Sequence, residues 1–198
     1  MSNTFLRQAT FTLSAPKTRF LPEDTGAEIA FVGRSNAGKS STLNALCGHK
    51  IARTSKTPGR TQAINVFTVS ENQRLIDLPG YGFAKTSLQM RQAWDELITS
   101  YLVHRASLQG IVIIMDIRHP LKPSDQAMIA WTEEHQIPSI LILNKSDKLS
   151  KNQQNKTLFS CKKQYPEHHF LLCSSLNMGG IHELATYCCD WLTPASPN

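Results

Sequence analysis

The sequence lacks the cysteine spacings of a disulfide framework or a zinc site. Its five cysteines make an odd number, and no two of them form a C-x-x-C pair. The neighbouring residues Cys188-Cys189 and His168-His169 match no zinc-binding spacing. Unpaired thiols are typical of a reduced, intracellular setting. We therefore expect a cytoplasmic protein without disulfides or a structural metal.

Long hydrophobic runs are also missing. The two longest, GIVIIM and SILIL, are far shorter than the roughly 20 residues needed to cross a bilayer. The N-terminal stretch MSNTFLRQATF has no apolar segment, so we expect no signal peptide. There is no internal repeat and no low-complexity block. A chain of 198 residues, 40% hydrophobic and 18% charged, is expected to form a single domain over residues 1–198.

Acidic residues are outnumbered by basic ones. The chain has 21 Lys and Arg against 15 Asp and Glu, a net charge of +6. This excess permits an anionic partner such as RNA or an acidic membrane face, although it is weak evidence alone. The stretch KIARTSKTPGRTQ has no apolar face, so we expect a basic loop carrying Lys50, Arg53, Lys56 and Arg60.

Short apolar runs alternate with longer amphipathic stretches along the chain. Because such alternation favours a mainly parallel sheet covered on both faces, the predicted class is α/β. We expect residues 1–27 and 193–198 to be extensions of this domain, and the alternating run at 63–69 to be an edge strand. The other expected strands are 28–33, 74–79, 110–117, 137–144 and 168–174, and the expected helices are 39–47, 88–106, 124–135, 150–163 and 180–192.

The stretch GRSNAGKSS follows an expected strand, opens an expected helix and fits the pattern G-x-x-x-x-G-K-S. Its glycines allow the backbone to curl, so that successive N–H groups and the helix N-terminus point at phosphate oxygens. Lys39 supplies a charge to the outer phosphates, and the Ser40 hydroxyl is suited to ligate Mg²⁺. The predicted phosphate contacts are Gly33, Arg34, Ser35, Asn36, Ala37, Gly38, Lys39, Ser40 and Ser41.

The stretch NKSD follows another expected strand and predicts which base is bound. Asp147 is suited to accept hydrogen bonds from the N1–H and 2-amino groups of guanine, and adenine offers neither donor. Lys145 would lay its stem along the base, while Asn144 would tie this loop to the phosphate loop. In CSSL, a weak motif by itself, backbone N–H groups near Ser174 and Ser175 are expected to meet the guanine O6. The expected ligands are GTP and GDP.

The stretch DLPGY is expected to lie beside the γ-phosphate. Asp77 would reach Mg²⁺ through water, and Gly80, after Pro79, would offer its N–H to the γ-phosphate. Ras-like enzymes place a glutamine directly after D-x-x-G to orient the attacking water. This chain has Tyr81 there. A phenol has one rotatable donor and no amide, so we expect Tyr81 to be dispensable for the chemical step.

The stretch TPGRTQ is predicted to close over the metal from the basic loop. Thr61 is the favoured ligand because it adjoins the next strand, and Thr57 is the alternative. Gly59 is expected against the nucleotide. Arg60 is more consistent with a contact to phosphate or RNA than with a catalytic charge. The predicted metal ligands are Ser40, Thr61 and Asp77.

With these motifs the chain resembles the translation-factor-like GTPases and, more closely, the EngB family of bacterial GTPases. The matching stretches are GRSNAGKSSTLNAL, TSKTPGRTQ, DLPGYGFAK and SSLNMGGI, and the resemblance spans about residues 5–192. One departure is Asn144, where members often carry threonine. The resemblance implies a Ras-like sheet of six strands, one of them antiparallel, with helices on both faces. It also implies a role in large ribosomal subunit assembly and in normal cell division and septation.

The resemblance also implies where catalytic help comes from. Asn36 matches an asparagine that coordinates K⁺ in related GTPases, and a cation there would offset charge developing in the transition state. A loop-stabilising hydrogen bond is an equally good interpretation of Asn36, and both stay open. The expected catalytic residues are Lys39, Asn36, Thr61 and Gly80, with slow intrinsic turnover.

The sequence admits two alternatives to a GTPase switch. A small-molecule kinase needs a second substrate site with several arginines in a lid, and the sequence has no arginine cluster after residue 118. The second alternative is a nucleotide-dependent scaffold that scarcely hydrolyses GTP. The favoured hypothesis is a monomeric, Mg²⁺-dependent GTPase that binds large-subunit ribosomal particles through rRNA, ribosomal protein or both.

Overall fold

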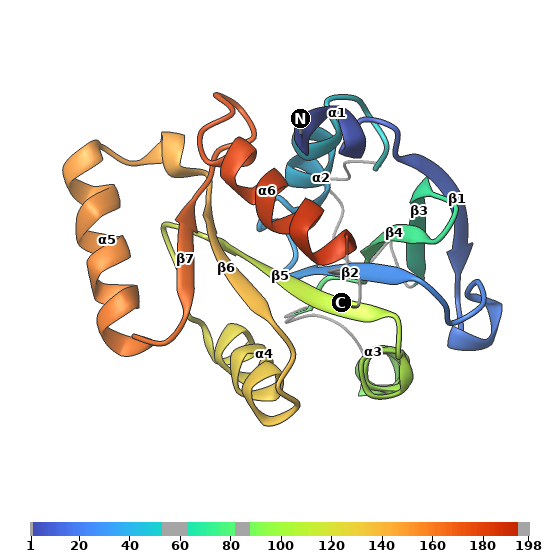
Figure 1. Ribbon diagram of the computed structural model, residues 1–198. Helices are drawn as coiled ribbons and strands as arrows, with labels where there is room; N and C mark the ends of the chain where they lie inside the picture. Colours follow the sequence, from blue (N-terminus) through green and yellow to red (C-terminus); the bar gives the residue numbers. More distant parts are fainter. Residues whose placement is uncertain (1, 53–62, 82–87, 194–198) are drawn as a thin grey trace.

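A seven-stranded sheet forms the middle layer of the molecule (Figure 1). The structure is a computed structural model and describes residues 2–52, 63–81 and 88–193. The strand order is β1-β3-β4-β2-β5-β6-β7. The strands are β1 (Thr10–Ala15), β2 (Ala27–Gly33), β3 (Ile64–Ser70), β4 (Gln73–Asp77), β5 (Leu108–Asp116), β6 (Ser139–Asn144) and β7 (His169–Leu172).

The sheet is mostly parallel, as expected. Strands β4, β2, β5, β6 and β7 pair in parallel, and β3 pairs antiparallel with both of its neighbours. The single reversed strand is therefore β3. The central strands are buried on both faces, which explains why β5 and β6 are apolar runs without alternation.

The expected count of six strands was wrong, because the N-terminal extension contributes a seventh. Strand β1 pairs with β3 in a register that matches Thr10 with Thr68 and Ala15 with Ile64. The run at 63–69 is therefore an interior strand and not an edge strand. The sequence TFTLSA of β1 does alternate polar and apolar residues, which is a strand pattern, but it was assigned to the N-terminal extension. The strand is largely exposed and broken by a bulge.

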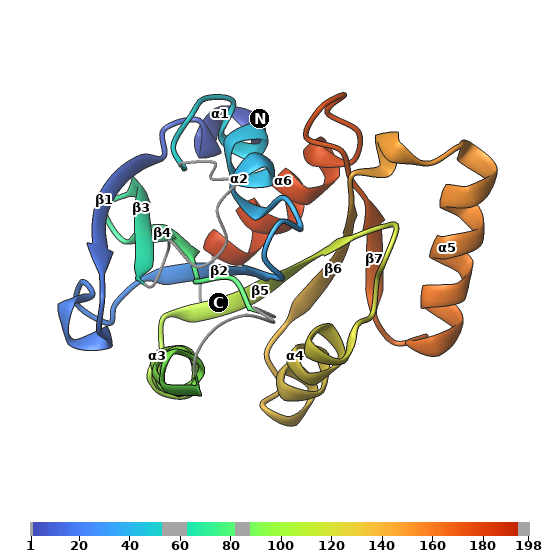
Figure 2. The same ribbon diagram turned by 180° about the vertical axis from the view of Figure 1, so that it is seen from behind.

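Helices cover both faces of the sheet (Figures 1 and 2). Helices α1, α2 and α6 pack over one hydrophobic core, and α3, α4 and α5 lie over the other. None of the described helices is long and apolar enough to cross a membrane. The helices are α1 (Ser2–Leu6), α2 (Lys39–Cys47), α3 (Leu88–His104), α4 (Pro123–Glu134), α5 (Lys151–Gln164) and α6 (Ile181–Leu192), with 3₁₀ turns η1 (Thr18–Phe20) and η2 (Ser146–Lys148).

The loops that carry the sequence motifs gather at one edge of the sheet. In a parallel sheet the carboxyl ends of all strands lie at the same edge, where ligands bind in open α/β folds. Strand β2 ends at Gly33, β4 at Asp77, β5 at Asp116 and β6 at Asn144. The fold therefore brings the phosphate, metal and base motifs together from distant parts of the chain.

Candidate nucleotide-binding site

The phosphate loop runs from the end of β2 into the first turn of α2. Gly38 has a φ of 99°, and a Cβ there would clash with the Asn144 amide. A Cβ at Gly33 would clash with the Ile114 backbone oxygen. Both positions therefore require glycine. Ser40 and Ser41 lie in the first turn of α2, beside the backbone N–H groups that the helix leaves unpaired.

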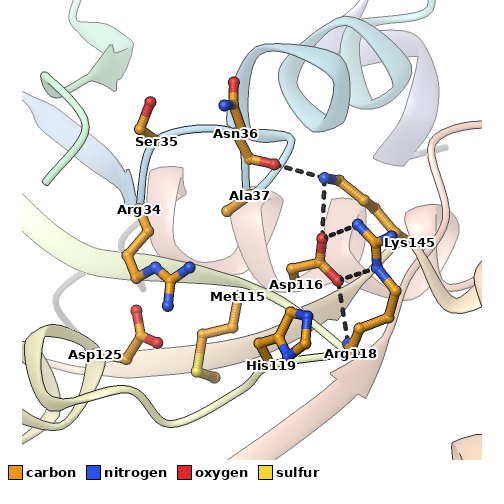
Figure 3. Close-up of a pocket in the computed structure, with 10 residues that line it drawn as sticks. All are labelled: Arg34, Ser35, Asn36, Ala37, Met115, Asp116, Arg118, His119, Asp125 and Lys145. Atoms are coloured by element: carbon orange, nitrogen blue, oxygen red, sulfur yellow. Dashed lines mark hydrogen bonds and ion pairs between the residues drawn. The ribbon is translucent and has the colours of Figure 1, made fainter. Parts of the chain in front are cut away.

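The loop after β6 is tied directly to the phosphate loop. The fully buried Asn144 donates from Nδ2 to the Ala37 backbone oxygen at 2.9 Å. Lys145, in a left-handed conformation with φ 61°, donates from Nζ to the Asn36 backbone oxygen at 2.5 Å (Figure 3). The two loops, more than a hundred residues apart in sequence, therefore form one rigid unit, as the motif predicted for Asn144.

Asp147 is positioned by the loop that follows β7. The Ser174 hydroxyl donates to Asp147 Oδ1 at 2.6 Å and accepts from the Leu176 backbone N–H at 3.2 Å. This hydrogen bond from Ser174 is the main reason that the pKa of Asp147 is lowered, and Lys148 Nζ adds to the effect at 3.2 Å. Ser175 follows in the same loop. Asp147 therefore presents an ionised carboxylate, which is what two guanine donors require.

Lys39 and Asp77 form an ion pair between the start of α2 and the end of β4. Asp77 is 4% exposed, and its other oxygen accepts from Asn65 Nδ2 at 3.4 Å. Burial lowers the pKa of Lys39 to about 7, while the adjacent carboxylate favours its charged form. Ser40 directly follows Lys39 on α2. Its hydroxyl and the Asp77 carboxylate are the hard oxygen donors that suit Mg²⁺.

Tyr81 lies against the phosphate loop but its phenol is directed elsewhere. The Tyr81 backbone N–H donates to the Gly33 backbone oxygen at 3.2 Å, and the Tyr81 backbone oxygen accepts from the Ser35 N–H at 3.0 Å. The side chain is 5% exposed and donates its O–H to Asp125 Oδ1 on α4 at 2.9 Å. Burial raises the pKa of Tyr81 well above its usual value. The phenol is therefore an anchor within the protein core.

Three residues at this edge of the sheet were not identified from the sequence motifs: Asp116, Arg118 and Asp125. They line a pocket beside the phosphate loop (Figure 3). Arg118 donates to both Asp116 oxygens at 2.9 and 2.6 Å, and Lys145 Nζ lies 3.0 Å from Asp116 Oδ2. Burial acts to raise the pKa of Asp116, but these two cations hold it well below its usual range.

Asp125 shares the pocket and caps α4. Its Oδ2 accepts from the Lys122 backbone N–H at 3.0 Å, and Arg34 extends from the phosphate loop toward its carboxylate (Figure 3). Burial raises the pKa of Asp125. The pattern Lys-Pro-Ser-Asp before an apolar helix signals this cap, but no local signal indicates the contact with Tyr81.

The remaining predicted site residues divide into two groups. Pro79 is buried after β4, and Gly80 lies so close to the phosphate loop that a Cβ there would meet the Gly33 oxygen at 3.3 Å. The predicted switch residues Thr61, Gly59 and Arg60, and the alternative Thr57, lie outside the described residues.

A phosphate loop joined in this way to an NKSD loop and a serine loop is the arrangement of guanine-nucleotide-binding P-loop proteins. The family model described as 50S ribosome-binding GTPase matches residues 28–145. A probable GTP-binding protein EngB of Aeromonas salmonicida (strain A449) is 48% identical over 91% of this chain and 86% of its own. One of Coxiella burnetii (strain RSA 493 / Nine Mile phase I) is 49% identical over 93% of both chains.

Solved structures agree in fold. A crystal structure of a probable GTP-binding protein engB has a TM-score of 0.68 at 24% identity, covering 84% of this chain and 98% of that one. Era in complex with MgGDPNP and 16S ribosomal RNA has a TM-score of 0.69 at 23% identity, covering 87% and 58%. The chain therefore belongs to the EngB family of GTP-binding proteins, within the GTPases.

Proposed function

We propose that this protein is a Mg²⁺-dependent GTPase whose GTP and GDP states act as a switch in assembly of the large ribosomal subunit. The observation that carries the nucleotide assignment is the pair of bonds from Asn144 and Lys145 to the phosphate loop. Family membership and the ribosome-binding family model support the ribosomal role. We further propose that the protein is a cytoplasmic monomer and is required for normal cell division and septation.

Guanine is recognised by Asp147, with Ser174 holding the carboxylate in place. Its two oxygens accept from the N1–H and 2-amino groups. Lys145 lies along the base while it remains bonded to the phosphate loop, so base and phosphate contacts are mechanically connected. The backbone N–H of Ser175 meets the O6, since the Ser174 N–H is already donated to the Gly179 backbone oxygen at 2.9 Å. The base is thereby read by hydrogen bonds that adenine cannot supply.

Phosphates and metal are held where β2 and β4 end. Lys39 would contact the outer phosphate oxygens in place of Asp77. Ser40, Asp77 and, in the GTP state, Thr61 would hold the metal. When bound, Mg²⁺ offsets charge on the β- and γ-phosphates. The N–H groups of the phosphate loop and of Gly80 orient the γ-phosphate.

Hydrolysis in this proposal does not depend on Tyr81. Its O–H is donated to Asp125 Oδ1 at 2.9 Å, so the phenol is already engaged within the protein. Asn36 is exposed and has a left-handed backbone with φ 64°, and its side-chain amide makes no hydrogen bond to another residue in the described part of the chain, so it is available to hold a K⁺ ion. Lys39, Gly80, Thr61 and a K⁺ ion at Asn36 would then supply the transition-state stabilisation.

The ribosomal proposal is tested by sedimentation. The protein is centrifuged with purified 50S subunits in a GTP analogue, in GDP and without nucleotide, at several salt concentrations. We expect more co-sedimentation with the GTP analogue than with GDP. If rRNA is contacted, binding also falls steeply as salt rises. Equal pelleting in all three states would remove the switch, and binding that ignores salt would indicate a protein contact.

A further inference from the structure

Helix α5 carries an unusual share of the positive charge. It stands at the outer edge of the sheet, beyond β7 (Figures 1 and 2). Its sequence, KNQQNKTLFSCKKQ, contains four lysines and no acidic residue. It therefore holds +4 of a net charge of +6 for the whole chain.

An aromatic side chain lies among these lysines on the outward face. The helix buries Gln154 and Cys161 toward the protein. Phe159 is 72% exposed, which makes it one of the two most exposed large hydrophobic side chains in the described residues. Lys156 precedes it by three positions and Lys163 follows it by four, so both flank the ring on the same face.

Helix stability does not account for this arrangement. Lys162 and Lys163 suit the C-terminal end of the helix dipole, but Lys151 occupies the first helical position, where a cation is unfavourable. None of the four lysines forms an ion pair with a carboxylate in the described part of the chain. Leaving the Phe159 ring in water also forgoes the stabilisation that burial would give. The face has the composition of a binding surface.

We propose that the outward face of α5 binds single-stranded RNA, with a base stacked on Phe159 and flanking phosphates at Lys156 and Lys163. Cationic side chains beside an exposed ring are the elements that proteins use to bind single strands without sequence preference. An acidic protein would satisfy the lysines but would leave the ring without a flat partner. The inference rests on the proposed ribosomal function and names a surface for it.

This contact is independent of the nucleotide state. The segment before α5 carries η2 with Asp147, which the proposed function assigns to the guanine base, and the base is the same in GTP and GDP. Within the described residues, α5 has no direct hydrogen bond to Gly80 or to the phosphate loop, and its Gln154 donates instead to the Ser146 and Leu149 oxygens at 2.8 and 2.9 Å, on the side of the guanine base. The face therefore acts as a constant RNA anchor, while discrimination between GTP and GDP belongs to other segments.

The test measures binding of a fluorescein-labelled, mixed-sequence 12-nucleotide RNA by anisotropy, using the full chain loaded with GDP or a GTP analogue. Phe159→Ala is expected to weaken binding about 5- to 100-fold without changing the salt dependence. The double variant Lys156→Gln/Lys163→Gln is expected to reduce the slope of log K against log salt by about 1.4, because each single-strand phosphate contact contributes about 0.7. Both effects should be equal in the two nucleotide states.

Matched controls come from the opposite edge of the sheet. Phe20 is 50% exposed there and lies near Lys17, so Phe20→Ala and Lys17→Gln remove the same groups from another surface. They are expected to leave RNA affinity within twofold, and fluorescent GDP affinity should be unchanged in every variant, which reports an intact fold. Phe159→Trp should retain binding.

Two results would overturn the inference. One is RNA affinity unchanged by both α5 changes. The other is α5 variants that bind RNA normally yet lose 50S subunits, which would indicate a protein partner. The switch proposal fails separately, if 50S binding of the wild-type protein ignores the nucleotide. The α5 contact and the ribosomal switch are therefore distinguishable.

Discussion

At the scale of single residues, base recognition depends on Asp147 being ionised and held in place. The Ser174 hydroxyl at 2.6 Å does both. Adenine would lose two donors and leave the carboxylate unpaired, at a cost of about 4–6 kcal/mol. We expect GTP to outcompete ATP by about a thousandfold or more, and Asp147→Asn to weaken GTP and favour xanthosine triphosphate. Displacement of fluorescent GDP measures this, with the exposed Asp190→Asn as control. Equal affinity for ATP and GTP would reject the guanine assignment.

Asp116 should make the free energy of unfolding depend on pH. Its pKa is lowered in the folded protein from an ordinary value of 3.8, because Arg118 and Lys145 favour the carboxylate despite burial. A carboxyl group with a lowered folded pKa stabilises the fold above its unfolded pKa, and this contribution is lost as the pH falls toward the folded pKa. Between pH 6 and pH 3 the free energy of unfolding should therefore fall more for wild type than for Asp116→Asn. Urea unfolding of both proteins at a series of pH values measures this difference. An equal fall in the free energy of unfolding for the two proteins would contradict the assignment.

Substitution of Tyr81 tests whether the residue directly after D-x-x-G takes part in GTP hydrolysis in this chain. Because its O–H is bonded to Asp125, Tyr81→Phe and Tyr81→Ala should leave intrinsic single-turnover hydrolysis within about threefold, under roughly 1 kcal/mol in barrier. Wild type should be faster in K⁺ than in Na⁺, and Asn36→Ala should lose that difference. A hundredfold loss in both Tyr81 variants, with no cation effect in any protein, would return Tyr81 to the catalytic residues.

At the scale of elements, α5 is held by a reciprocal cap. The Ser150 side chain accepts from the Gln153 N–H, and the Gln153 side chain accepts from the Ser150 N–H at 3.0 Å. Ser150→Ala should lower the free energy of unfolding by about 1 kcal/mol, within the usual range for N-caps. Ser160→Ala, on the exposed side of the same helix, should change it far less. Urea unfolding compares the two, and equal effects would exclude a capping role.

The elements differ in how well the sequence predicts them. Helix α2 has the expected bounds, 39–47, because the phosphate-loop motif and Gly48 mark both of its ends. Strand β1 was missed although TFTLSA alternates polar and apolar residues, because a six-residue run outside the core motifs does not show which strand it pairs with. Asn144 could be placed because its motif has a known geometry. The Tyr81–Asp125 bond joins residues 44 positions apart and depends on how β4 and α4 pack, which no local pattern encodes.

At the scale of the whole molecule, the sheet separates two tasks. The carboxyl ends of β2, β4 and β6 hold the nucleotide motifs, while α5 presents its charge at the β7 edge. In the proposed account the outward face of α5 binds the ribosome in both nucleotide states. Segments near the γ-phosphate bind it only in the GTP state, from another part of the molecule. The basic loop at residues 50–62 adjoins the nucleotide site in sequence and mostly lies outside the described residues.

Single-turnover GTP hydrolysis with and without purified 50S subunits tests the central claim most directly. The account predicts slow intrinsic hydrolysis, on the order of 10⁻⁴ to 10⁻³ per second, since no glutamine orients the attacking water. It also predicts a faster rate when 50S subunits are present, and no such acceleration with 30S subunits. GTP that stays intact both alone and with 50S subunits would contradict the account and favour a scaffold that binds GTP without using its hydrolysis.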